Sequence, residues 1–254
     1  MKKIIALFMA LLMLLSFTGC AERTHSQKVK KSRELVVGVT NFEPMSYKEN
    51  GEWTGFDVEF AKLFAKEKLN AKVKFVEIKA SERFEKLQNG EIDCVWSGLT
   101  QIQGEEEKAS YSFSYAKSIQ MLVMKKDLVD KYDDGFKIKD LKFVIEEASA
   151  GEFYTVFRNS YRNIEKLPTK EDVMTKIMNG EADATVIDAV YASAVTKQGA
   201  RYEQLGIGFD FSSDGYCVAF PTDSDITDIL NEFITDNIKT ELKTLADKYG
   251  VVLV

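Results

Sequence analysis

Short apolar runs alternate with apolar residues at helical spacing in the first hundred positions of the chain. Residues 35–40, 73–78 and 92–96 are predicted to be strands, because each is a β-branched or alternating apolar run of strand length. Between them, apolar residues recur at helical spacing from Phe56 and again from Phe84. This order of strands and helices predicts a layer of parallel strands covered by helices.

The same order returns in the second half of the chain. A strand is predicted at 142–145, a helix that Thr169 can cap comes later, and a further strand covers 183–187. The sequence LQNGEIDCVW at 87–96 is matched by IMNGEADATV at 177–186, and each places Asn-Gly between a helix and a strand. This repeat indicates two lobes of like architecture, although Asn-Gly is common enough after helices for the match to arise by chance.

The C-terminal stretch returns to the first lobe in this interpretation. A strand is predicted at 216–220, and helical spacing runs from Ile229 to Tyr249 with no strand after it. The chain then crosses between the lobes twice, near 118–123 and 211–215, and such a pair of connections forms a hinge with a cleft beside it. We therefore expect one lobe from 34–120 plus 213–254 and another from 121–212.

The N-terminus has the features of a secretory signal. A short basic start is followed by an apolar run from Ile4 to Leu15, too short to span a bilayer comfortably. Small residues before Cys20 resemble a bacterial lipobox, in which that cysteine carries the lipid. Residues 1–20 are thus predicted to be a lipoprotein signal peptide, with a membrane anchor at Cys20, and 21–33 a flexible tether. The folded part is expected outside the cytoplasm.

Composition excludes several classes of function. The net charge of −6 argues against a nucleic-acid partner. His25, in the predicted tether, is the only histidine, so histidine-based catalysis and most zinc sites are not expected in the folded body. No metal or cofactor is predicted. Cys94 and Cys217 could form a disulfide or remain buried thiols, and the sequence leaves both open.

Several motifs, in their order and spacing, resemble bacterial extracellular solute-binding protein family 3, the polar amino acid substrate-binding lipoproteins of ABC transporters. They begin with Phe42-Glu43-Pro44-Met45 and Gly55-Phe56-Asp57, and continue with Ser97-Gly98-Leu99-Thr100 and Ser149-Ala150-Gly151-Glu152. The resemblance implies a periplasmic-binding-protein-like type II fold: two α/β lobes, a two-strand hinge and a ligand cleft. It also implies a monomer without catalytic activity that binds a small molecule, an amino acid or an analogue, and delivers it to an ABC transporter permease.

The resemblance also implies which residues line the cleft. Asp188 matches the acid that holds the ligand ammonium, although a strand-end Asp can equally cap the helix after it. Ser149 and Ala150 match the turn that meets the ligand carboxylate, and Phe42 the aromatic over the ligand. The remaining candidates are Met45, Ser97, Gly98, Thr100 and Glu105.

Glu105 is the main departure from the family pattern. It stands where the family has an arginine that clamps the ligand carboxylate. Three interpretations remain open: Glu105 points to solvent, Lys108 partly replaces the arginine, or the pocket holds two acids and prefers a cationic or carboxylate-free ligand. Two other functions also remain open: a cyclohexadienyl dehydratase-like enzyme with Glu105 as proton donor, for which Lys108 or Arg83 would have to supply the cation, and a sensory receptor.

Overall fold

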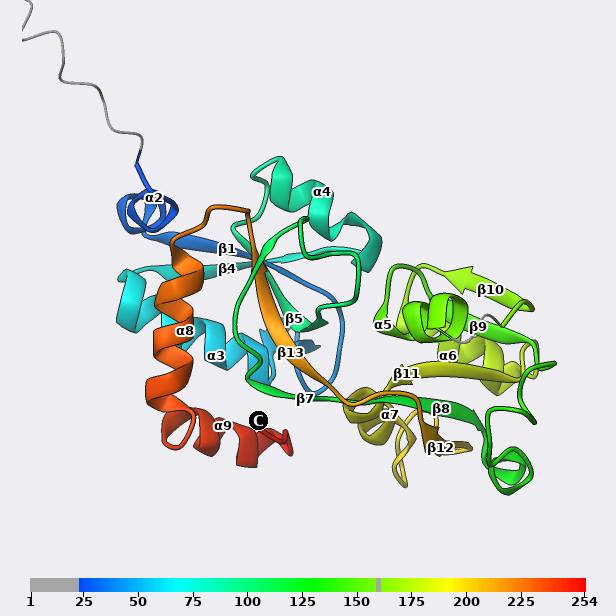
Figure 1. Ribbon diagram of the computed structural model, residues 1–254. Helices are drawn as coiled ribbons and strands as arrows, with labels where there is room; N and C mark the ends of the chain where they lie inside the picture. Colours follow the sequence, from blue (N-terminus) through cyan, green and yellow to red (C-terminus); the bar gives the residue numbers. More distant parts are fainter. Residues whose placement is uncertain (1–22, 159–160) are drawn as a thin grey trace, which may run out of the picture.

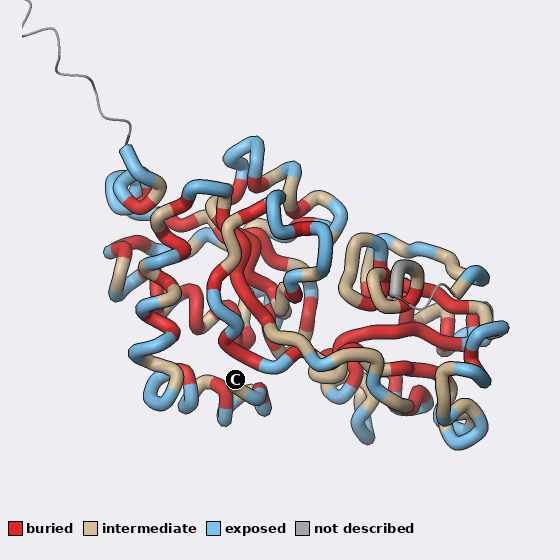
Figure 2. Tube along the Cα trace, viewed as in Figure 1, coloured by how far each residue is buried: buried red, intermediate tan, exposed pale blue. Residues whose placement is uncertain are grey.

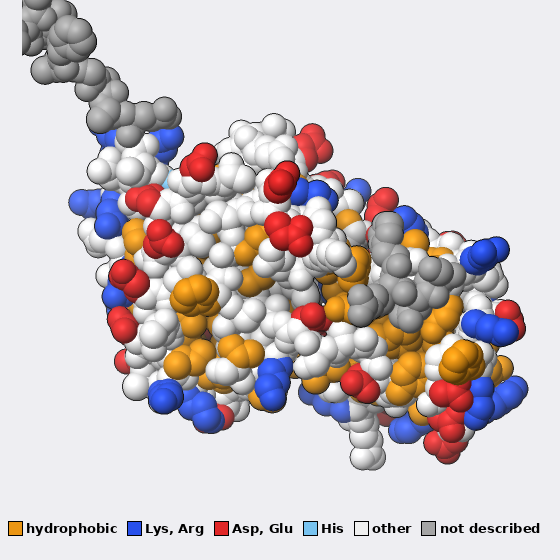
Figure 3. All heavy atoms as spheres, viewed as in Figure 1, with side chains coloured by type: hydrophobic (Ala, Val, Ile, Leu, Met, Phe, Trp, Pro, Cys, Tyr) orange, Lys and Arg blue, Asp and Glu red, His pale blue; other side chains and the backbone are white. Residues whose placement is uncertain are grey.

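The computed structural model describes residues 23–158 and 161–254, which form two α/β lobes side by side (Figure 1). Each lobe is built on its own sheet, and buried residues run along both sheets (Figure 2). On the face shown in Figure 3, acidic and basic side chains are interspersed over both lobes. No helix among the described residues is long and apolar enough to cross a membrane.

The first sheet has the strand order β4-β1-β5-β13-β6, and β7 also pairs with β13. Strands β4, β1 and β5 are parallel, and β13 runs antiparallel to them. A separate hairpin, β2 (Tyr47–Glu49) with β3 (Glu52–Thr54), lies apart from this sheet. The strands of the first sheet are β1 (Glu34–Val39), β4 (Lys72–Glu77), β5 (Cys94–Thr100), β6 (Ser110–Tyr111), β7 (Ala116–Ser118) and β13 (Asp214–Phe220).

Two hydrophobic clusters form on this sheet because the side chains of β5 alternate between its faces. Trp96 packs with Phe60 and Phe233 in one cluster, and Val95 packs with Leu87 in the other. The helices of this lobe are α3 (Phe56–Phe64) with the π-helical turn η1 (Ala65–Leu69), η2 (Ala80–Glu82), α4 (Arg83–Gln88), α8 (Ile226–Asn237) and α9 (Glu241–Tyr249).

The second sheet has the order β10-β9-β11-β8-β12, with β10, β9 and β11 parallel and β8 antiparallel to both of its neighbours. The helix between β10 and β11 is capped by Thr169 and closed by Gly180, as the sequence predicts. The elements of this lobe are β8 (Gln120–Lys125), η3 (Lys126–Lys131), β9 (Phe143–Glu146), α5 (Ala150–Glu152), η4 (Phe153–Arg158), β10 (Ile164–Leu167), α6 (Lys170–Asn179), β11 (Ala184–Asp188), α7 (Ala189–Thr196) and β12 (Leu205–Asp210).

The chain passes between the sheets at two places. One connection is residue 119, between β7 of the first sheet and β8 of the second. The other is 211–213, between β12 and β13. The C-terminal helices α8 and α9 pack with the first sheet, where α8 contacts β13 and α9 contacts α3. The two lobes are thus joined by short extended segments.

Residues 25–32 form a helix, α2 (His25–Ser32), so the prediction of a flexible tether through residue 33 is wrong. Thr24 and Gln27 make a capping box, in which each side chain accepts a hydrogen bond from the backbone of the other. Val29 is buried against the first lobe. The segment has too few apolar residues for periodicity to reveal the helix, but Thr24-x-x-Gln27 was a local signal for its start.

Hydrogen bonds fix α2 to the first lobe. The backbone N–H and the hydroxyl of Ser26 both donate to Asp225, at 2.8 and 2.5 Å. The His25 ring lies 2.7 Å from the Ser224 hydroxyl and 3.1 Å from the Asp93 carboxylate. The only histidine of the chain therefore orders this helix and lies away from the cleft.

Candidate ligand-binding site

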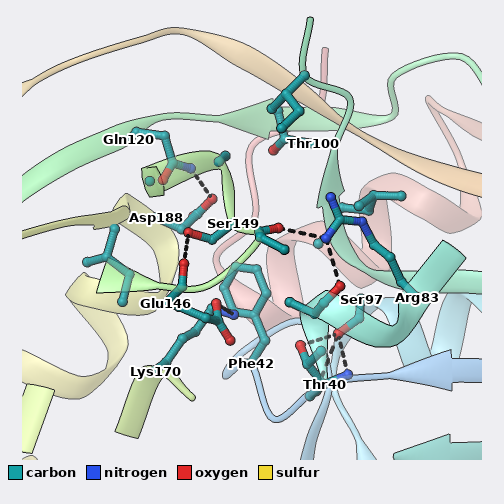
Figure 4. A pocket seen from close by; sticks show the side chains of 18 of the residues that line it. Thr40, Phe42, Arg83, Ser97, Thr100, Gln120, Glu146, Ser149, Lys170 and Asp188 are labelled. Atoms are coloured by element: carbon teal, nitrogen blue, oxygen red, sulfur yellow. Dashed lines mark hydrogen bonds and ion pairs between the residues drawn. The ribbon is translucent and has the colours of Figure 1, made fainter. Parts of the chain in front are cut away.

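A pocket lies between the two sheets, at the carboxyl ends of β1 and β5 on one side and of β9 and β11 on the other (Figure 4). Ligands of open α/β sheets bind at this edge. From the first lobe the pocket is lined by Thr40, Phe42, Ile78, Ala80, Arg83, Val95, Ser97, Gly98, Leu99, Thr100 and Ile102. From the second lobe it is lined by Gln120, Glu146, Ala148, Ser149, Ala150, Gly151, Lys170, Val186, Ile187 and Asp188.

Phe42 and Gly98 form one wall of the pocket in close contact. Gly98 has a φ of +55°, and a β-carbon there would lie 2.2 Å from the Phe42 ring, so only glycine fits. The Gly98 N–H donates to the buried carboxylate of Asp57 at 2.5 Å. Burial raises the pKa of Asp57 to about 7, against the opposing effect of its hydrogen bonds. Asp57 thereby fixes the backbone that carries the wall.

Hydroxyl groups from several segments meet beside this wall. The Ser97 hydroxyl accepts a bond from the Thr40 N–H at 3.0 Å and lies 2.6 Å from the Ser46 hydroxyl. Thr100 pairs with the Ser118 hydroxyl at 2.8 Å. Ser97 and Thr100 line the pocket, but their side chains already have partners within the protein.

Asp188 lies at the end of β11 and is 5% exposed. One carboxylate oxygen accepts hydrogen bonds from the Tyr216 hydroxyl and the Val190 N–H; the other accepts from Gln120 at 3.0 Å and Ser118 at 3.2 Å. Burial raises its pKa to about 6, although these hydrogen bonds lower it. Asp188 thus lines the pocket and also caps α7, so the two roles considered from sequence are compatible.

Glu105 is 6% exposed, which shows that the interpretation of a solvent-facing side chain is wrong. It accepts a hydrogen bond from the Arg83 guanidinium at 2.8 Å, and the Lys108 ammonium lies 3.5 Å away. Glu105 does not line the pocket, whereas Arg83 does. A carboxylate already paired with a guanidinium is poorly suited to serve as the proton donor considered for an enzyme.

Arg83 links the two lobes. Its Nη1 donates to the Ala80 carbonyl at 2.7 Å and, across the cleft, to the Ala148 carbonyl at 2.6 Å. Sequence reasoning considered Arg83 only as a cation for the enzymatic alternative. Its contact with Glu105 joins residues 22 positions apart, which no local pattern reveals.

A second ion pair in the pocket was missed from sequence. The Lys170 ammonium lies 2.7 Å from the Glu146 carboxylate and 4.8 Å from the centre of the Phe42 ring. Glu146 ends β9 and Lys170 begins α6. A signal was available, since Glu146 directly follows the predicted strand and charged residues at such a strand end face the cleft.

Of the remaining candidate residues, Ser149 and Ala150 line the pocket and Met45 does not. Ser149 and Ala150 line the pocket at the start of α5, where the Ser149 hydroxyl accepts a bond from the Glu152 N–H at 3.1 Å. Met45 is fully buried and does not line the pocket, so it belongs to the core of the first lobe.

The cysteine and metal questions can be answered for the described part of the chain. Cys94 and Cys217 are buried free thiols. Within residues 23–158 and 161–254 no group of His, Cys, Asp and Glu side chains is arranged to hold a metal ion. Cys20 and the predicted signal peptide lie outside the described residues.

Comparisons with known proteins agree with this architecture. The family model of the bacterial extracellular solute-binding proteins, family 3, matches residues 35–252. The probable amino-acid-binding protein YxeM of Bacillus subtilis is 28% identical over 260 residues, which cover 98% of this chain and 95% of that protein.

Solved structures give the same result. The ancestral amino-acid-binding protein AncCDT-1, a precursor of cyclohexadienyl dehydratase, is 25% identical, with a TM-score of 0.80 over 89% of this chain and 99% of its own. An ancestral arginine-binding protein bound to arginine is 26% identical, with a TM-score of 0.77 over 85% of this chain and 97% of its own. The predicted fold class, a type II periplasmic-binding-protein-like fold, is confirmed. The chain therefore belongs to the bacterial extracellular solute-binding proteins of family 3.

Proposed function

We propose that this protein captures an amino acid or a related small solute by closure of its two lobes and delivers it to the permease of an ABC importer. The observation that carries the proposal is the pocket itself, which is lined from both lobes and contains charged side chains of both signs. A solute held between lobes is removed from water when they close, so that its polar bonds strengthen. The names of its relatives, which include an amino-acid-binding and an arginine-binding protein, support this class of ligand.

The roles of individual residues follow from their positions. Phe42 would pack against the apolar part of the solute, and Asp188 would face its ammonium group, as a charge-assisted contact. Ser149 and Ala150, at the start of α5, also line the pocket, and an anionic group of the solute could be held there. The protein would bind as a monomer and catalyse no reaction.

The attachment to the membrane belongs to the same proposal. The sequence before Cys20 supports a lipid anchor outside the cytoplasm. Such an anchor would keep the protein near the permease. In cells, a Cys20→Ala variant would then move from the membrane fraction to the soluble fraction, and its retention in the membrane fraction would contradict the anchor.

A thermal-shift screen with amino acids and amines tests the binding function. A ligand at a hundred times its dissociation constant stabilises the folded state by about 2.7 kcal/mol, which such a screen detects. Phe42→Ala should abolish the shift, whereas Phe113→Ala should keep it, because Phe42 is 2% exposed at the pocket and Phe113 is 59% exposed outside it. If no compound in the screen stabilises the protein, the proposed function is wrong.

A further inference from the structure

The charges around the pocket do not cancel. Two cations line it, and each is neutralised by a buried acid: Arg83 by Glu105 at 2.8 Å and Lys170 by Glu146 at 2.7 Å. The four side chains are between 6% and 10% exposed, so solvent screens these pairs little. Both cations are therefore already matched before any solute enters.

Asp188 is the remaining acid of the lining, and it has no ion pair within the described residues. Its four hydrogen-bond donors are neutral: two hydroxyl groups, one side-chain amide and one backbone N–H. Lys170 acts on it only at a distance and lowers its pKa, which burial raises to about 6. At pH 8 the carboxylate is ionised, and the residues that line the pocket, counted with their buried partners, then carry one net negative charge; Lys108, the second partner of Glu105, is 48% exposed and does not line the pocket.

A hollow that adjoins the pocket also contains more acids than cations. This hollow shares Thr40, Ile78, Ala80 and Glu146 with the pocket and is also lined by Glu77, Glu82 and Glu171, with Lys79 as its one cation. Glu77 and Glu82 lie in exposed pairs with lysines, at 2.6 and 3.9 Å, which solvent screens. Glu171 has no ion pair in the described part of the chain; it accepts a hydrogen bond from Asn41 of the other lobe at 2.9 Å.

These two observations are independent, and they agree. A closed cleft that retains an unpaired charge carries a desolvation cost, which a ligand of opposite charge removes and a neutral zwitterion does not. Acidic groups in the adjoining hollow also raise the local concentration of cations near the pocket. The charge of Arg83 is already matched by Glu105, and its Nη1 donates to two backbone carbonyls, so a solute carboxylate would find only the remaining N–H groups of Nε and Nη2.

We propose that the solute of this protein carries a net positive charge, with its cationic group against Asp188. The inference rests on the proposed binding function and narrows the ligand to an amine with a net charge of at least +1. Two sources share this chemistry: amino acids with a cationic side chain, and amines without a carboxylate. The charge of the interior favours both over a neutral amino acid of the same shape.

Calorimetry at pH 8 with pairs of matched shape tests the inference. Arginine and lysine are compared with citrulline and norleucine, their neutral counterparts, and with agmatine and cadaverine, which lack the carboxylate. We expect a cation to bind at least about tenfold more tightly than its neutral counterpart. The affinities for agmatine and arginine, compared with each other, distinguish the two sources. Equal or tighter binding of citrulline or norleucine overturns the inference while the binding function stands. A lack of binding by all the cations overturns it as well.

Two variants separate the charge of the cleft from direct contact. Glu105→Gln keeps the shape of a residue that does not line the pocket but leaves Arg83 uncompensated, and Asp188→Asn removes the unpaired acid itself. Each substitution should reduce the ratio of the affinity for the cation to the affinity for its neutral counterpart by at least about tenfold. Asp236→Asn, an exposed site on α8 with the same change of charge, should leave the preference unchanged. An unchanged preference in Glu105→Gln, with folding verified by circular dichroism, overturns the inference.

Discussion

Removal of the Arg83 guanidinium should destabilise the protein strongly, because it leaves Glu105 buried without its main partner. The Arg83 and Glu105 side chains are 6% and 8% exposed. Breaking a buried pair by removing one partner costs about 3–5 kcal/mol. Lys108, 3.5 Å from the Glu105 carboxylate, provides partial compensation, so we expect about 3 kcal/mol for Arg83→Met. For a chain of this size that loss corresponds to a melting temperature lower by about 6–12 °C.

Thermal and urea unfolding, followed by circular dichroism, measure this loss. The double variant Arg83→Met/Glu105→Gln should recover much of it, because the orphaned charge is then absent. Lys86→Met is a matched control on the same helix: Lys86 pairs with Glu91 at 3.1 Å on the surface, and its loss should change stability little. A loss below about 1 kcal/mol in Arg83→Met, or a double variant no more stable than the single one, would refute the reasoning.

Two further predictions concern the pocket wall and the groups beneath it. Gly98→Ala should weaken ligand binding by at least about tenfold, or about 1.4 kcal/mol, because its β-carbon displaces Phe42. Gly104→Ala is the control, since Gly104 has a φ of +90° and a β-carbon there would have no atom within 4 Å. Equal losses of affinity in the two variants, measured by calorimetry, would contradict the geometry of the wall. Asp57, with a pKa raised from 3.8 to about 7, holds a proton in the folded state that the unfolded state releases, so stability falls as pH rises from about 4 to about 7. Asp57→Asn should therefore reduce the difference in unfolding free energy between pH 5 and pH 8, and urea titrations with an unchanged difference would disprove this role.

The sequence predicted the architecture well because period and cap chemistry are local. The strands at 35–40 and 73–78 differ by one residue from β1 and β4, and the third, predicted at 92–96, begins and ends later as β5, 94–100. Thr169 caps α6 as expected. In contrast, the polar helix α2 has its partners at Asp225 and Ser224, about 200 positions away, so its packing was invisible from its own residues.

The candidate site was predicted in outline and missed in its charges. The family resemblance implied Phe42 and Asp188 as lining residues, and both line the pocket at the carboxyl ends of strands. The neutralisation of Arg83 by Glu105 and of Lys170 by Glu146 depends on which side chains meet after the chain folds. A single departure from the family pattern, such as Glu105, thus cannot be interpreted by itself, because its effect on the charge of the site depends on the cation that the side chain contacts.

The docking of α2 divides the mechanical roles of the two lobes. Figure 1 shows α2 at the end of the first lobe that is distant from the second, where Asp225 and Asp93 hold it. A force applied to the chain at residue 23 is therefore transmitted to the first lobe. The second lobe is joined to the first through residue 119 and residues 211–213, so a rotation about these two connections would leave α2 and residue 23 in place.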